Sequence, residues 1–249
     1  MVDFATAGDL SPENMHHKIL LYGNSGAGKS WASAGSGGSD VFILATERNA
    51  LQSIKHSNPK ARVLYTGEIG GVREFIGAAI SGELHKQGAR VLVIDSLTEC
   101  QRLLKDEILA GKAGNEFGIQ DWGTLTEKMR RMLRTIRDLP YHVICTALSQ
   151  SEIEESTGMR HVAPAFEGKK LPNEVAQYFN VVGYCYKQEN VNGEGKRVVE
   201  HKIMVDGSSR FVVKPCHPLN GIMRPDLQMW IGALNSGEIP EQPEAPAGE

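Results

Sequence analysis

Eight residues near the start of the chain, GNSGAGKS at positions 23–30, have the types and spacing needed to hold a phosphate chain. They match the pattern G-x-x-x-x-G-K-[ST], in which glycines let backbone N–H groups turn inward around phosphate oxygens. The lysine neutralises the β- and γ-phosphates, and the hydroxyl that follows it is a ligand for magnesium. We therefore expect ATP and Mg²⁺ to bind this loop, termed the P-loop, through Gly23, Asn24, Ser25, Gly26, Ala27, Gly28, Lys29 and Ser30.

Acidic residues at the ends of two apolar runs are candidates to complete this site. The run RVLVIDS carries Asp95, which we expect to orient Mg²⁺ together with Ser30. A water molecule that attacks the γ-phosphate also needs a group that orients it or accepts its proton. Glu47, at the end of VFILATE, is the preferred candidate for this role, and Glu99, one helical turn beyond Asp95, is the alternative.

A third polar side chain follows the apolar run HVICTALSQ, which ends in Gln150. Its amide could bond the γ-phosphate and report hydrolysis to the segment that follows, or it could simply cap a strand. The segment after Gln150 lacks apolar periodicity for more than twenty residues, which is typical of a functional loop. We therefore count Lys29, Glu47 and Gln150 as the catalytic candidates.

The elements that must position these residues alternate between short branched runs and longer helical patterns, which is typical of a parallel sheet covered by helices. We expect an α/β fold with a mainly parallel central sheet flanked by helices and extended by C-terminal antiparallel strands. The expected strands lie at 19–22, 41–45, 63–65, 91–94 and 143–147, followed by 181–186, 198–205 and 211–213. The expected helices are a short one after Gly28 and others at 72–84, 97–109 and 125–139, the last with Met129 and Met132 on its core side.

Composition limits the class of protein. The 249 residues are 41% hydrophobic and 23% charged, with no apolar run of bilayer length, so we expect a globular, cytoplasmic protein without a membrane partner. The four cysteines are too widely spaced for a metal knuckle. We expect a lead-in at 1–17, one ATPase core at 18–234 and an acidic tail at 235–249. Without that tail the net charge of −3 becomes +1, which is compatible with a local basic surface that binds an anionic partner.

Several features, taken in order, resemble the phage RecA-like P-loop ATPases that include single-strand annealing proteins. These features are the P-loop, Glu47, VLVIDS, DWGTLTEKMRRMLRTIRDLP, HVICTALSQ and FEGKKLPNEVAQYFNVVGYCY. The resemblance covers residues 18 to about 230. It implies a RecA-like core with Glu47 as catalytic glutamate, Asp95 as magnesium carboxylate and Gln150 as a switch. It also implies a homo-oligomeric ring or filament in which a neighbour inserts a basic finger, with Arg210, Lys214, Lys187 and Arg224 as candidates. Because only about 17 residues precede the core, annealing or accessory work is more credible than full strand exchange.

Single-stranded DNA is the partner that this resemblance implies, and a single-strand binding protein is a further candidate partner. Binding a single strand requires basic groups for its backbone and flat side chains for its bases. One candidate loop carries Lys112, Phe117 and Trp122, although Trp122 also suits core packing. The favoured loop follows Gln150 and carries Arg160, His161, Phe166, Lys169 and Lys170. The alternatives are a small-molecule kinase, a helicase or packaging motor, and a nucleotide-switched binding module.

Overall fold

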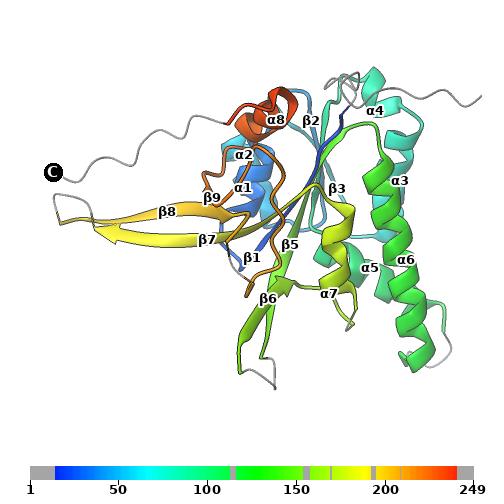
Figure 1. Ribbon diagram of the computed structural model, residues 1–249. Coiled ribbons are helices and arrows are strands. Elements are labelled where there is room, and N and C mark those ends of the chain that lie inside the picture. The colour runs from blue at the N-terminus through cyan, green and yellow to red at the C-terminus, as the bar shows by residue number, and fades with distance from the viewer. Residues whose placement is uncertain are drawn as a thin grey trace, which may run out of the picture.

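A computed structural model describes residues 15–112, 116–153, 158–168, 170–191, 195–207 and 209–239. Within these ranges one sheet runs in the order β3-β2-β4-β5-β1-β7-β8-β9, and β6 pairs only with β5 (Figure 1). The strands are β1 (Lys18–Gly23), β2 (Val41–Ala45), β3 (Arg62–Tyr65), β4 (Val91–Asp95), β5 (His142–Ile153), β6 (Arg160–Pro164), β7 (Val181–Val191), β8 (Arg197–Met204) and β9 (Ile222–Met223).

The six strands from β3 to β7 in this order pair in parallel, and β8 and β9 extend the sheet in antiparallel fashion. This is the expected α/β architecture. It brings the carboxyl ends of β1, β2, β4 and β5 to one edge, so that the P-loop, Glu47, Asp95 and the end of HVICTALSQ meet there. The P-loop strand β1 lies between β5 and β7 and is therefore held on both sides.

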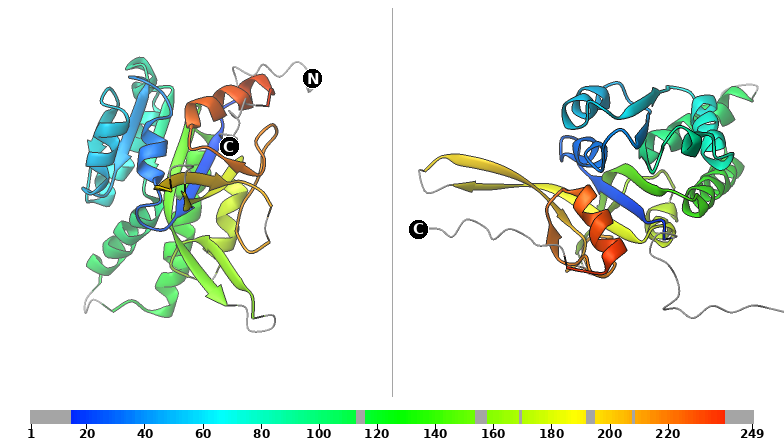
Figure 2. Two further views of the ribbon diagram at one scale, coloured as in Figure 1. Left: turned by 90° about the vertical axis from the view of Figure 1, so that its left-hand side faces the viewer. Right: turned by 90° about the horizontal axis from the view of Figure 1, so that it is seen from above.

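Helices cover both faces of the sheet (Figure 2). They are α1 (Lys29–Ala34), α2 (Ala50–Ser57), α3 (Ile69–Ile80), α4 (Glu83–Lys86), α5 (Leu97–Ala110), α6 (Ile119–Asp138), α7 (Leu171–Glu174) and α8 (Leu227–Ser236), with a 3₁₀ turn at Val175–Tyr178. Residues of α1, α2 and α8 form one apolar layer and residues of α3 to α7 form the other. No helix within the described ranges has both the length and the apolar character that a membrane span requires.

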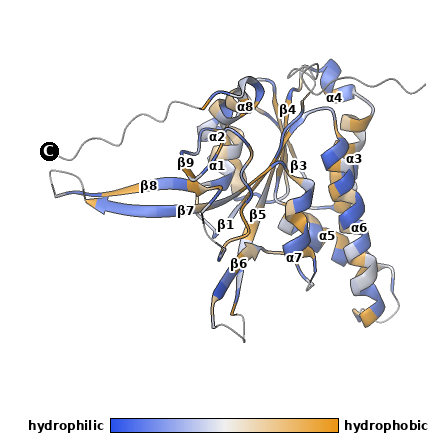
Figure 3. Cartoon of the chain, in the orientation of Figure 1, coloured by the Kyte–Doolittle hydropathy of each residue, from blue (hydrophilic) through white to orange (hydrophobic). Residues whose placement is uncertain are grey.

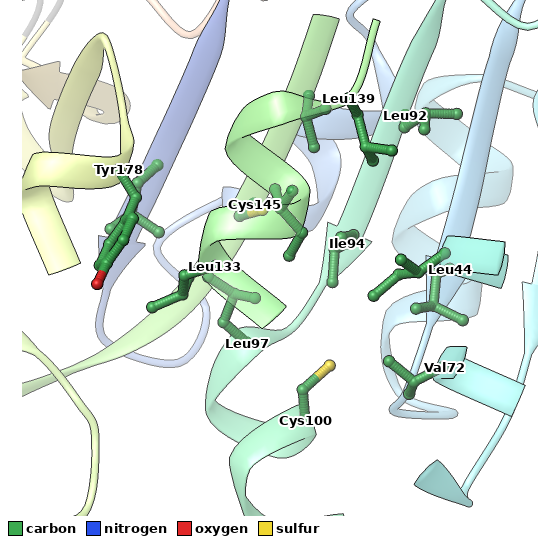
Figure 4. Close-up of a cluster of buried hydrophobic side chains, with 14 of the residues drawn as sticks. Leu44, Val72, Leu92, Ile94, Leu97, Cys100, Leu133, Leu139, Cys145 and Tyr178 are labelled. Atoms are coloured by element: carbon green, nitrogen blue, oxygen red, sulfur yellow. The ribbon is translucent and has the colours of Figure 1, made fainter. Parts of the chain in front are cut away.

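Side chains of β1 alternate between these two layers, as the period of a strand requires. Leu20 and Tyr22 join the layer of α3 to α7, and Ile19 and Leu21 join the layer of α1, α2 and α8. Figure 4 shows the first layer, in which the thiol of Cys145 on β5 lies among leucines of the sheet and α6. All four cysteines are free thiols.

Helix α6 begins six residues earlier than expected and includes Trp122. It is amphipathic, with hydrophilic and hydrophobic residues alternating along it in Figure 3. Met129 is buried and Met132 packs at the edge of the core, as the sequence predicted. The hydrophilic residues include Arg131 and Arg134, which pair with Glu127 at the surface.

Several regions differ from expectation. The segment after Gln150 is not a simple loop, because β5 continues to Ile153 and pairs with β6 as an antiparallel hairpin. Residues 211–213 do not form a strand, and within them Phe211 makes one isolated bridge, to Val162. Helices α2 and α8 were not expected from the sequence. The expected boundaries of lead-in and tail stay predictions, since residues 1–14 and 240–249 lie outside the described residues.

Candidate active site

Lys29 lies at the start of α1 with its ammonium directed back into the P-loop. Its Nζ donates hydrogen bonds to the carbonyl oxygens of Gly23 and Asn24, at 2.9 Å each. The residue is 9% exposed, and this burial lowers its pKa, while Cys185, Asp95 and Glu47 act in the opposite direction. A buried cation held only by carbonyl oxygens can exchange these contacts for phosphate oxygens, which carry full charge.

The P-loop packs tightly against β7 and β8, and its glycines make this approach possible. A Cβ atom on Gly23 would lie 2.3 Å from the carbonyl oxygen of Cys185. A Cβ atom on Gly28, where φ is +92°, would lie 2.7 Å from Nδ1 of His201. A larger residue at position 23 would therefore clash with backbone, and one at position 28 would have to displace the His201 ring.

The two acidic candidates are tied together at the ends of neighbouring strands. The hydroxyl of Thr46 donates to the carbonyl oxygen of Asp95 at 3.0 Å and accepts from the N–H of Ser96 at 2.9 Å. The hydroxyl of Ser96 in turn donates to Oε1 of Glu47 at 3.1 Å. One oxygen of Glu47 is thus engaged, which fixes the carboxylate beside Asp95.

Asp95 has the features of a magnesium carboxylate. It is 5% exposed, and its Oδ1 accepts a short hydrogen bond from the hydroxyl of Thr146. Its Oδ2 is buried and has no hydrogen-bond partner among the described residues. Such an orphaned oxygen fits a site in which Mg²⁺, or water bound to Mg²⁺, supplies the missing partner. The described residues contain no group of three or more His, Cys, Asp or Glu that could hold a metal, so Ser30, Asp95 and phosphate oxygens would share the ion.

The structure brings the P-loop and both acids into one cavity of about 640 Å³. Its lining consists of Ser25, Gly26, Gly28, Lys29, Ser30, Trp31, Glu47, Asn49, Ala50, Ser53, Asp95, Ser96, Leu148, Lys187, His201 and Pro225. Glu99 is not part of this lining, and its carboxylate pairs with Arg102 at 3.1 Å. The geometry thus favours Glu47 over Glu99 as the residue that orients water.

Strand β5 lines the cavity at Leu148, and Gln150 lies two residues beyond this point, outside the lining. Between them, Ser149 donates from its hydroxyl to Oδ1 of Asn24 at 2.6 Å. Ser149 therefore makes a side-chain hydrogen bond between β5 and the P-loop, and the role of Gln150 as a switch stays a prediction.

Two basic residues of the β7–β8 hairpin line the cavity, and sequence reasoning did not place them there. Lys187, considered only as a finger from a neighbouring protomer, lies over the P-loop of its own chain, with Nζ 3.7 Å from where a Cβ on Gly26 would be. Nδ1 of His201 lies 3.0 Å from the carbonyl oxygen of Ala27. Only the strand register, which local sequence patterns do not reveal, brings these residues to the site.

The other candidates for a neighbour's finger lie outside the cavity lining. Nζ of Lys214 donates to the carbonyl oxygen of Phe179 at 2.7 Å, so this ammonium is already held within its own chain. Arg210 and Arg224 are exposed and take part in interactions within the chain. None of these three residues lines the cavity.

The expected DNA-loop residues fall into separate environments. Phe166 is 3% exposed and packs in the core beside α7, so the expectation that it stacks on bases is wrong for this conformation. Arg160 is exposed on β6 and contacts the hydroxyl of Ser151, and Lys170 is exposed before α7. Lys169 lies outside the described residues.

The alternative DNA loop is largely occupied by contacts of its own. Lys112 pairs closely with Asp121, the ring of Phe117 packs edge-on against Trp122 at 4.8 Å, and Nζ of Lys105 lies 5.2 Å from the Trp122 ring. Trp122 is 38% exposed, so it combines packing with partial access to solvent.

A row of aromatic rings, not expected from the sequence, lies on the face of β7 opposite Lys187. The rings of Tyr184 and Tyr186 are stacked at 6.1 Å, and Phe211 lies 4.5 Å from Tyr184. Arg160 is close enough to lower the pKa of Tyr184, although burial, the larger effect, raises it. Flat side chains and a basic residue are thus adjacent on this surface, which we term the tyrosine row (Tyr184, Tyr186 and Phe211).

Comparison with known proteins identifies the domain type. A family profile described as an AAA domain matches residues 15–214. No curated protein matches the chain significantly. Among solved structures, a prototypical ATPase from the type III secretion system of pathogenic bacteria is similar over 68% of this chain, with 18% identity and a TM-score of 0.44. The chain spans about half the length of that ATPase, since the match covers 52% of it.

Proposed function

This chain belongs to the AAA domain family of P-loop ATPases, and from this premise we propose a RecA-like protein that couples ATP hydrolysis to single-stranded DNA in phage-type recombination, annealing or repair. The observation that carries the ATPase part is the single cavity shared by Lys29, Glu47 and Asp95. Support for the DNA part comes from the elements that continue from this cavity to the exposed Arg160 and the half-buried aromatic rings beside it.

Hydrolysis proceeds by in-line attack of water on the γ-phosphate. Glu47 orients the water with the carboxylate oxygen that Ser96 does not occupy and accepts its proton. The bond from the γ-phosphorus to the β–γ bridging oxygen breaks, and the departing charge stays on ADP, where Lys29 and the P-loop amides stabilise it. Mg²⁺, held by Ser30 and Asp95, would supply further positive charge to the β- and γ-phosphates.

Strand β5 is the proposed link between the nucleotide and DNA. It contacts the P-loop through the hydrogen bond from Ser149 to Asn24 and continues without a break into the β5–β6 hairpin that presents Arg160. A shift of Asn24 on phosphate binding would therefore also displace Ser149, at the base of this hairpin. Arg160 would bind the DNA backbone, and the tyrosine row beside it would stack on bases.

Phosphate release measured with and without single-stranded DNA tests this proposal. We expect turnover that requires Lys29 and rises when DNA is added. Phosphate transfer to an added metabolite would favour a kinase, and duplex unwinding would favour a motor. Turnover that no DNA alters would refute the coupling while leaving the ATPase assignment intact.

Two arginine substitutions on the same chain, one on the proposed DNA-binding surface and one away from it, test this surface. Arg160→Ala should weaken binding of an oligonucleotide and reduce the slope of log K against log salt by about 0.7, since one phosphate contact on a single strand is lost. Arg134→Ala removes a similarly exposed arginine from the far helix α6 and should leave both quantities unchanged. Equal effects of the two substitutions would contradict the assigned surface.

We further propose assembly into a ring or filament in the cytoplasm of a host cell, in which the exposed Arg210 or Arg224 of one protomer contacts its neighbour. Light scattering after size exclusion, with and without ATP and DNA, measures this assembly directly. A mass that stays that of one protomer under all conditions would refute it.

A further inference from the structure

We propose that Lys187 and His201 complete the nucleotide site within their own chain, with Lys187 binding the triphosphate directly and His201 holding the P-loop in its binding conformation. This inference rests on the proposed binding of ATP by the P-loop. It adds a second phosphate-binding lysine that comes from the β7–β8 hairpin rather than from a neighbouring protomer.

Strand register explains why these two residues act as a pair. Lys187 on β7 and His201 on β8 are directly opposite each other in the antiparallel ladder, so both side chains project from the same face of the hairpin. That face meets the P-loop, because β7 pairs with β1 and the carbonyl oxygen of Cys185 abuts Gly23. Both residues consequently line the nucleotide cavity.

The charge balance of the cavity calls for the second lysine. The triphosphate, Glu47 and Asp95 together bring more negative charge than Lys29 and one divalent cation neutralise. Lys187 is exposed over the P-loop, and within the described ranges no carboxylate lies at ion-pair distance from its Nζ. An unpaired ammonium on a flexible stem, facing a phosphate loop, is suited to bind phosphate as a point charge.

Other basic residues of the same hairpin already have carboxylate partners. Lys202, adjacent to His201 but on the opposite face, pairs with Glu200 at 3.1 Å. Arg197, farther out, pairs closely with Glu189. The basic residues of the hairpin are therefore not equivalent, and Lys187 is the one whose charge remains available to a ligand in the cavity.

His201 acts through the P-loop backbone and is a positioning residue. A carbonyl oxygen only accepts, so the contact at 3.0 Å requires a proton on Nδ1, which donates to Ala27. Ala27 lies between Gly26 and Gly28, both of which have positive φ. The hydrogen bond thus fixes the loop at the turn whose N–H groups face the phosphates.

The role of Lys187 is tested by ATP turnover of Lys187→Ala. We expect kcat/KM to fall by about 10²-fold, the usual cost of removing one group that stabilises the transition state. Lys202→Ala, on the opposite face of the hairpin, should retain wild-type turnover. If the wild type hydrolyses ATP and Lys187→Ala matches it, this inference is wrong while the proposed function stands; an inactive wild type would instead refute the proposed function.

Mixed assemblies decide whether Lys187 acts within its own chain. Lys29→Ala and Lys187→Ala are co-expressed with different tags and purified through both tags. If Lys187 acts in its own chain, mixed assemblies turn over ATP no faster than Lys187→Ala alone, because no protomer has both lysines. Activity restored toward the wild type would show that Lys187 serves a neighbour's site and would overturn the inference. Failure of the chains to co-purify, with Lys187→Ala still impaired, supports action within one chain.

Conservative replacements separate positioning by His201 from general packing. Asparagine places an N–H donor where Nδ1 lies, whereas glutamine places it one bond farther out. We expect His201→Ala and His201→Gln to raise the KM for ATP by about five- to tenfold, as the loss of one hydrogen bond implies, and His201→Asn to remain near the wild type. Equal KM values in all three variants would refute the positioning role.

Discussion

Replacing Gly28 with alanine tests the packing of the P-loop against β8. The new Cβ would lie 2.7 Å from Nδ1 of His201, in a residue whose φ is +92°. Left-handed backbone costs a non-glycine residue about 1–2 kcal/mol. Displacement of the His201 imidazole breaks its hydrogen bond to Ala27, which contributes about 1 kcal/mol to stability. We therefore expect Gly28→Ala to lower the free energy of unfolding by about 2–3 kcal/mol.

A double-mutant cycle with His201→Ala shows whether the contact is the cause. His201→Ala alone should cost about 1 kcal/mol, and the double variant should cost no more than Gly28→Ala, because the hydrogen bond is lost only once. Gly26→Ala is the matched control, since its φ is +76° but its Cβ would lie 3.7 Å from the nearest atom. It should incur backbone strain alone and add to His201→Ala without coupling.

Urea unfolding followed by circular dichroism measures these free energies, and thermal unfolding should show a drop of about 4–12 °C in Tm for Gly28→Ala. The same variants should bind ATP more weakly, because the displaced loop no longer presents its amides to phosphate. If the costs of Gly28→Ala and His201→Ala add in full, or if Gly28→Ala costs no more than Gly26→Ala, the packing of β8 on the P-loop is not what stabilises this loop.

Three further perturbations address other parts of the site and the sheet. Glu47→Gln should reduce phosphate release by about 10²- to 10⁴-fold while ATP still binds, whereas Glu99→Gln should have little effect. The reverse pattern would show that Glu99 on α5, not Glu47, orients the attacking water. Thr146→Val removes the hydroxyl that donates to Asp95 and should cost about 1–3 kcal/mol in urea unfolding, with Thr146→Ser close to the wild type; equal costs would show that the hydroxyl is unimportant. Burial, together with neighbouring histidines and a lysine, lowers the pKa of His142 from 6.5 to about 4, so the native state binds fewer protons than the unfolded state. Stability should therefore be full above pH 6.5 and fall by up to about 3 kcal/mol as the pH drops to 4, and His142→Asn should flatten this part of the profile.

Sequence patterns predicted those strands and site residues that depend only on short stretches of neighbouring residues. An apolar run followed by a glycine-rich loop or an acid is a short-range signal, and β1, β2 and β4 begin and end within one residue of the expected positions. The parallel sheet then brings Lys29, Glu47 and Asp95 together without further information, because the carboxyl ends of its strands share one edge.

Features that depend on pairing at long range could not be predicted. Strand β6 and the end of β5 form a hairpin off the main sheet whose outer residues are exposed on both faces, so they show no alternation of apolar and polar residues. Phe166 follows this hairpin and looked accessible, but the chain returns it to the core. Lys187 and His201 are fourteen positions apart and meet only through the register of β7 with β8.

Thr46 gives the two acids a fixed spacing. Its single hydroxyl links the end of β2 to the end of β4, and Ser96, which donates to Glu47, is held by the same hydroxyl. The separation of the two carboxylates is thus set by a contact to the main chain of the neighbouring strand, which neither acid makes itself.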